Sequence, residues 1–265
     1  MNATRLTVFI LLLACAAPIF GERLPERYER VLVPVLPVGR WAAPLWIRND
    51  GPETVDMFPL VTDADSPSRG RRFPLVEPGL PAGRTFSFRT LSSVLPAPGY
   101  IPLTTTFAGA VLYVERGKRQ NVRFQLSVQG TQIPVVPEED FVAAPMSLLM
   151  PRIIDGKRYT LRVYSLDSNP GNVEVTFEAL LGSPPVSSEV LRLERPNAQA
   201  LCAVSPCPWP DVPFTPAYAA LFFDTTTISS WTERITVTPE PGARIWMFLS
   251  ESDPVTREVL VQAPN

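Results

Sequence analysis

The chain has 265 residues, 45% of them hydrophobic, and its 24 basic and 26 acidic side chains give a formal net charge of −2. This balance gives no reason to expect a nucleic-acid partner. The absence of histidine removes the usual general base of acyl transfer and a common ligand of zinc. The 31 prolines favour short strands joined by turns over long helices.

Residues 1–21 predict an export signal. Arg5 supplies a positive charge, and residues 6–14 form an apolar run that is too short to span a bilayer as a helix. Cleavage before Glu22 would release a soluble protein, whereas the run that ends at Cys15 resembles a lipobox, in which this cysteine is lipidated. Both interpretations stay open, and no later stretch is apolar for long enough to cross a membrane. We therefore expect an exported protein, extracellular or periplasmic, with Cys15 as a candidate lipid anchor.

Alternation of apolar and polar residues predicts strands throughout the rest of the chain. The clearest segments are residues 86–88, 122–128, 159–163 and 173–179. Because successive side chains of a strand point to opposite faces, we expect each segment to have one buried and one solvated face. Turn signals such as residues 49–52 separate the strands. This pattern is typical of antiparallel sandwiches.

The chain also repeats itself. Residues 109–129 align without a gap on residues 242–262, and residues 39–60 resemble residues 156–180. A repeated unit of roughly 100 residues predicts two similar domains.

We therefore expect an all-β protein made of two tandem immunoglobulin-like antiparallel β-sandwiches that arose by internal duplication. The first domain should span residues 28–131 and the second residues 140–263, with residues 130–139 as a short connector. Residues 141–150 are the one segment that could be helical, and Pro145 and Pro151 would keep such a helix short.

The number of residues that separates matching positions of the two copies is larger at their ends than at their starts. This difference predicts an insertion at about residues 198–216 of the second copy. Cys202 and Cys207 lie in it, and we expect them to form a disulfide in an exported protein. Trp209 and Phe214 also lie in it and are the candidate partner-binding residues, because exposed aromatic rings anchor ligands. The alternative is that both rings cover an open edge of the second sandwich. Most of the other tryptophans should be core residues: Trp41, Trp46, Trp231 and Trp246.

No set of residues indicates catalysis. A Ser–Lys pair would need Lys118 or Lys157, and each lies in a polar turn where a lysine keeps its proton. Glycoside hydrolysis would need two carboxylates. The acidic clusters lie in predicted turns or in the connector, where solvated loop charge explains them: Asp63/Asp65, Glu138–Asp140 and Glu251/Asp253. We expect no catalytic residue and no cofactor.

Two acidic turns and one basic run could serve as binding sites. Residues 167–171 and 63–65 are weak calcium patterns, and ordinary turns between strands explain them equally well. Residues 69–72 form a basic run that could meet an anionic surface, but a solvated loop is the simpler explanation. We therefore assign no metal ligand, and calcium binding stays open.

Three segments share a strand-and-turn pattern, namely residues 46–57, 131–141 and 163–175. They resemble segments of a loosely defined group of exported bacterial proteins built from tandem immunoglobulin-like sandwiches. The resemblance covers nearly the whole chain after the signal and implies a fold and a compartment, not a reaction. Periplasmic pilus chaperones are also two-sandwich proteins of this size, and that likeness is one of architecture alone.

These observations predict a non-enzymatic, exported binding or structural protein of the cell envelope or the extracellular space, with a protein or a glycan as its partner. Two alternatives stay open. The first is a periplasmic chaperone or assembly factor whose sheet edge accepts a strand from its partner. The second is a carbohydrate-binding accessory module.

Overall fold

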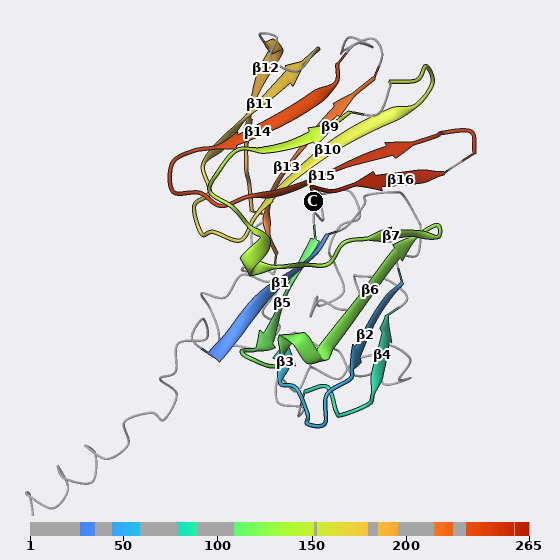
Figure 1. Ribbon diagram of the computed structural model, residues 1–265, viewed down its shortest axis with the longest axis vertical. Coiled ribbons are helices and arrows are strands. Elements are labelled where there is room, and N and C mark those ends of the chain that lie inside the picture. The colour runs from blue at the N-terminus through green and yellow to red at the C-terminus, as the bar shows by residue number, and fades with distance from the viewer. Residues whose placement is uncertain are drawn as a thin grey trace, which may run out of the picture.

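The computed structural model describes residues 27–34, 44–58, 79–88, 109–150, 153–179, 185–195, 215–224, 232–256 and 258–264. The elements in these ranges are sixteen β-strands and two short 3-10 turns, so the predicted all-β class is confirmed (Figure 1). The described residues include no apolar helix of membrane-spanning length. The segment at 141–150 is not helical, since it contains the strand β9 (Met146–Leu149).

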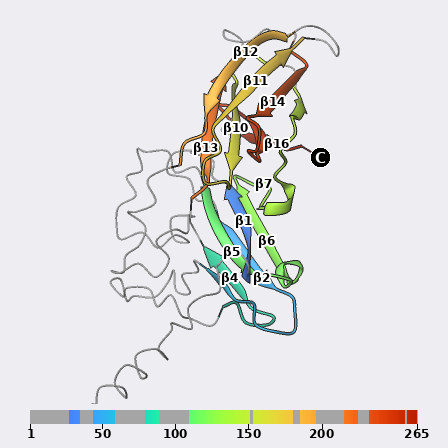
Figure 2. The same ribbon diagram turned by 90° about the vertical axis from the view of Figure 1, so that its left-hand side faces the viewer.

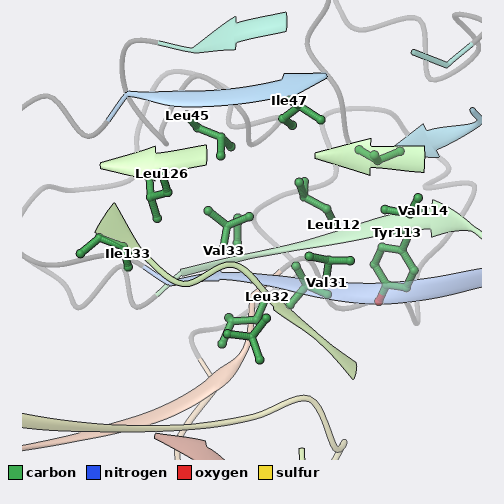
Figure 3. Close-up of a cluster of buried hydrophobic side chains, with 14 of the residues drawn as sticks. Val31, Leu32, Val33, Leu45, Ile47, Leu112, Tyr113, Val114, Leu126 and Ile133 are labelled. Carbon is green, nitrogen blue, oxygen red and sulfur yellow. The ribbon is translucent and has the colours of Figure 1, made fainter. Parts of the chain in front are cut away.

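The first half of the chain forms two facing antiparallel sheets of four strands each. Its strands are β1 (Tyr28–Pro34), β2 (Leu45–Asn49), β3 (Met57–Phe58), β4 (Thr85–Phe88), β5 (Gly109–Glu115), β6 (Val122–Val128), β7 (Thr131–Ile133) and β8 (Val136–Pro137). One sheet has the order β3-β5-β1-β8 and the other the order β4-β2-β6-β7. Val31 and Val33 of β1 point toward Leu45 and Ile47 of β2, and these four fully buried side chains belong to the core between the sheets (Figure 3).

The second half forms two further antiparallel sheets around a core of its own. Its strands are β9, β10 (Arg158–Ser165), β11 (Asn172–Glu178), β12 (Pro185–Arg192), β13 (Ala217–Phe223), β14 (Arg234–Pro239), β15 (Trp246–Ser252) and β16 (Val259–Gln262). The sheet orders are β12-β11-β14-β9 and β13-β10-β15-β16. The core lies between them, where Val175 and Phe177 of one sheet share a buried cluster with Leu161 and Met247 of the other.

The two halves have equivalent strand orders. The sheet β4-β2-β6-β7 corresponds to β13-β10-β15-β16, and β3-β5-β1 corresponds to β11-β14-β9. Among the described strands, β8 and β12 have no counterpart in the other half.

The equivalence differs from the sequence alignment at one place. Matching residues 109–129 with 242–262 places β5 on β15 and β6 on β16, whereas the sheet positions pair β5 with β14 and β6 with β15. The gap-free alignment is therefore shifted by one strand. Such a shift is possible because neighbouring strands of a sandwich have the same two-residue alternation and match one another in sequence. The spacing that predicted the insertion depended on this alignment. The described strands instead place an additional strand, β12, between β11 and β13.

The predicted connector at residues 130–139 is largely part of the first sandwich. Thr131–Ile133 forms β7, which pairs with β6, and Val136–Pro137 forms β8, which pairs with β1. The 3-10 turn η3 (Glu138–Asp140) follows directly. The strands of the first sandwich therefore extend to Pro137.

The two sandwiches lie one above the other in both views, and the sheet that contains β10 and β15 faces the first sandwich (Figures 1 and 2). Leu32 points away from the first core (Figure 3) and shares a buried cluster with Tyr164 and Phe248 of that sheet. The Oγ1 of Thr131 also donates a hydrogen bond to the carbonyl oxygen of Val259. The solvated face predicted for residues 159–163 is therefore wrong, since Thr160 and Arg162 are buried as well.

Arg162 is a buried cation at this junction, 4% exposed. Its guanidinium carbon lies 5.5 Å from the centroid of the Phe248 ring, and its Nη1 donates to Ser250 Oγ at 2.5 Å. No carboxylate of the described residues pairs with it, its Nε has no hydrogen-bond partner, and burial lowers its pKa. A buried charge without a counter-ion is costly, so Arg162 opposes folding.

We expect Arg162→Met to leave the free energy of unfolding unchanged or to raise it by up to about 2 kcal/mol, because methionine fills similar space without a charge. Arg162→Ala is the comparison, and it should destabilise the protein because it leaves a cavity. Denaturant unfolding of the three proteins measures both effects. A methionine variant as unstable as the alanine variant would mean that the guanidinium contacts stabilise the fold.

Candidate functional site

An open groove lies on the outer face of the sheet β4-β2-β6-β7. Leu45 and Ile47 of β2 are fully buried in the core, so the alternate residues Trp46 and Arg48 point outward. The strand register places Trp46 beside Gln125 of β6 and Ser87 of β4, and places Arg48 beside Arg123 and Thr85. The sheet therefore presents a tryptophan surrounded by polar side chains.

The groove has a volume of about 420 Å³ and is open to solvent. It is lined by Trp46, Arg48, Thr85, Arg123, Phe124 and Gln125. Trp46 is half-buried, so part of its ring is accessible from the groove. Groove-lining side chains thus combine an apolar platform with hydrogen-bond donors and acceptors, which suits a ligand that has both kinds of surface.

A single carboxylate holds the two arginines of the groove. Asp50 accepts a hydrogen bond from Arg48 Nε on Oδ1 at 2.6 Å, and its Oδ2 forms an ion pair with Arg123 Nε at 2.5 Å. Two like charges placed opposite each other on neighbouring strands repel. Asp50 offsets one of them and keeps both guanidinium groups at the groove.

The side chain of Asn49 holds the turn that positions Asp50. Its Nδ2 donates to the carbonyl oxygens of Glu53, at 2.7 Å, and Leu80, at 2.9 Å, and its Oδ1 accepts from Gly51 N at 2.9 Å. The backbone N–H of Asp50 donates to the carbonyl oxygen of Asn121 at 2.8 Å. The turn after β2 is therefore tied by four hydrogen bonds, three of them to one fully buried amide.

The site residues predicted from sequence lie outside the described residues. These are Cys15, Cys202, Cys207, Trp209 and Phe214. The same is true of the acidic pair Asp63/Asp65 and the basic run at residues 69–72. Their predicted roles stay predictions.

The prediction that most of these tryptophans are core residues holds for Trp246 and does not hold for Trp46. Trp246 is 5% exposed and packs at the junction, whereas Trp46 faces the groove. Trp41 and Trp231 lie outside the described residues. A signal for Trp46 was available, because it shares its face of the strand with Arg48 and not with the apolar Leu45 and Ile47.

Glu138 is not the solvated loop charge that its place in the connector predicted. Its carboxylate accepts Arg30 Nε at 2.9 Å, Arg30 Nη2 at 2.5 Å and Arg244 Nη2 at 3.1 Å. These arginines, with the bonds from Arg30 dominant, lower the pKa of Glu138 to about 2. The contacts join the first sandwich to the turn before β15, so Glu138 is a structural residue of the junction.

The two lysines also hold structural ion pairs. Lys157 binds Glu251, which lies buried in β15 and is not the solvated charge predicted for it. Lys118 binds Glu115 and Glu53 at 3.1 Å each. The hydrogen bonds that the lysines donate to these carboxylates raise the pKa of both, so neither is suited to act as a general base at neutral pH.

In the weak calcium pattern at residues 167–171, the carboxylate of Asp167 is bound by an arginine. Asp167 Oδ2 accepts the backbone N–H of Arg244 at 2.7 Å, and Oδ1 accepts its Nη2 at 3.2 Å. Gly171 has a φ of 69°, as the turn interpretation predicts. Among the described residues no group of three or more potential ligands is arranged to hold a metal ion.

The groove on the first sandwich is thus the candidate site that the described residues support best. It offers binding surface and hydrogen-bond donors, and two of its arginines are paired with Asp50. No family model matches the chain, and no curated protein or solved structure shows significant similarity to it.

Proposed function

We propose that this protein is a non-enzymatic, exported binding protein and that the groove around Trp46 binds a glycan. The observation that carries the proposal is a half-buried tryptophan in an open groove whose other outward-facing side chains are polar. The export signal predicted for residues 1–21 supports a site of action at the cell envelope or outside the cell.

A sugar ring matches this surface chemically. One face of a pyranose presents C–H groups that pack on an aromatic ring, while the hydroxyl groups at its edge need hydrogen-bond partners. Trp46 supplies the platform, and Gln125, Thr85 and Ser87 supply neutral donors and acceptors from the adjacent strands. All of these groups stand on a sheet, which keeps them in place before the ligand arrives.

We expect Trp46→Ala to weaken glycan binding at least tenfold, because the stacking platform is lost. The measurement is retention and affinity of the purified protein on a panel of immobilised oligosaccharides. Phe222→Ala is the matched control, since Phe222 is a 66% exposed aromatic on the second sandwich. Thermal unfolding would verify that both variants are folded. A wild-type protein that binds no glycan, or a Trp46 variant that binds as the wild type does, would overturn the proposal.

A second candidate function is strand acceptance from a protein partner. Its support is β12, an eight-residue strand at the edge of its sheet in which Val190 is 71% exposed. Unpaired edge groups can pair with an added strand. A co-purifying polypeptide that protects the backbone amides of β12 from hydrogen exchange would favour this function over glycan binding.

We also infer an immunoglobulin-like relationship for each sandwich. The order β4-β2-β6-β7 fits the C′-C-F-G sheet of a variable-type domain, and β3-β5-β1 fits D-E-B. The repeat departs from that family in one respect, because the strand in the D position precedes the strand in the C′ position along the chain. The tandem arrangement that the sequence predicted is compatible with this assignment.

A further inference from the structure

We infer that the sugar bound in this groove carries a carboxylate, which makes the ligand a uronic acid residue of an acidic polysaccharide. This inference rests on the proposed glycan-binding function and names the substrate class of the same site. Its support is the pair of arginines beside Trp46 and the way in which Asp50 holds them.

The groove has an unbalanced positive charge. Arg48 and Arg123 each carry one charge, and Asp50 is the single carboxylate that pairs with them in the described part of the chain. Both guanidinium groups are accessible, with side chains 60% and 81% exposed. An anionic ligand would balance the remaining charge at a site that is otherwise left to solvent.

The geometry of the ion pairs leaves the binding ends of both arginines available. Each arginine contacts Asp50 through its Nε, and no Nη atom of Arg48 or Arg123 has a hydrogen-bond partner among the described residues. The Nη groups form the forked end of a guanidinium, which binds an oxyanion through two parallel hydrogen bonds. Asp50 thus holds each arginine by its inner nitrogen and does not occupy the fork.

The spacing of the platform and the forks favours a carboxylate attached directly to the sugar ring. Trp46 and Arg48 are two residues apart on one strand and share a face, so their backbones lie roughly 7 Å apart. Arg123 lies opposite Arg48 in the register. A sugar ring stacked on Trp46 would present a carboxylate that is attached directly to one of the sugar's ring carbons to the two arginines. A sulfate ester would place its charge one bridging atom farther from the ring.

The test compares oligogalacturonate with its fully methyl-esterified form, which keeps the sugar skeleton and removes the charge. We expect isothermal titration calorimetry of the full chain to show at least tenfold tighter binding of the acid form. The Arg48→Gln/Arg123→Gln double variant should lose this preference, so that it binds the acid and the ester with similar affinity. Arg192→Gln, an exposed arginine on β12, is the matched control and should behave as the wild type. Raising the salt concentration should weaken binding of the acid form alone.

The possible outcomes separate the inference from the proposed function. Equal binding of acid and ester that Trp46→Ala abolishes would overturn the acidic-sugar inference and leave glycan binding intact. A preference for a sulfated oligosaccharide of equal length over oligogalacturonate would overturn the carboxylate assignment. No binding of any oligosaccharide would overturn both proposals. The inference is supported if the double variant loses the preference for the acid form while the wild type and Arg192→Gln keep it.

Discussion

Replacing Asn49 by alanine is expected to lower the free energy of unfolding by about 2–4 kcal/mol. The side chain is fully buried, and it satisfies the carbonyl oxygens of Glu53 and Leu80 and the N–H of Gly51. Alanine would remove these three hydrogen bonds, each of which contributes about 0.5–1.5 kcal/mol. Urea unfolding followed by circular dichroism measures the change.

The control for Asn49 is an amide with one exposed contact. Asn172 donates its Nδ2 to Glu240 Oε1 at 2.7 Å in an exposed setting, so Asn172→Ala should change stability by no more than about 0.5 kcal/mol. Asn49→Ala should also weaken glycan binding, because the turn it holds carries Asp50. Stability of Asn49→Ala within error of that of Asn172→Ala would contradict the structural role assigned to this amide.

The second large effect is expected at the junction of the sandwiches. Glu138→Gln should lower the free energy of unfolding at pH 7 by about 1–3 kcal/mol, because it removes the charge that binds Arg30 and Arg244. The effect is below that of a fully buried pair, since these side chains keep some contact with solvent. Chemical unfolding at constant salt measures the loss.

The same contact makes the effect of Glu138→Gln depend on pH. The pKa of Glu138 is lowered to about 2 in the folded protein, whereas a glutamate in an unfolded chain titrates near pH 4.3. Its contribution is therefore complete above about pH 4.5 and is lost as the pH falls toward 2. The stability difference between wild type and Glu138→Gln should shrink across this window. Glu139→Gln removes a charge at the exposed neighbouring position and is the matched control for stability at pH 7. A constant difference for Glu138→Gln would contradict the assignment.

The alternation along single strands was sufficient to predict many local elements. The segments predicted at residues 122–128 and 173–179 correspond to β6 and β11, which have the expected alternation of buried and exposed side chains. At β10 the same pattern predicted a solvated face, yet all its side chains except that of Arg158 are buried. Alternation reports which residues share a face, and it does not report what covers that face.

The candidate groove could be predicted in part. The turn at residues 49–52 and the outward side of Trp46 both follow from local sequence. The pairing of Arg48 with Arg123 depends on the register between β2 and β6, which are separated by more than half of the first sandwich. The shared partner Asp50 and the buried amide of Asn49 follow from that register and from the contact of the turn with Asn121.

The sequence by itself determined the all-β class and the position of several strands, because two-residue periodicity and turn chemistry are local properties. Only the tertiary structure decided which strands of the two halves correspond, because every strand of a sandwich carries a similar alternation. It also decided the roles of Glu138, Arg162 and Glu251. Whether a charge is solvated, paired or buried depends on residues brought next to it from distant parts of the chain.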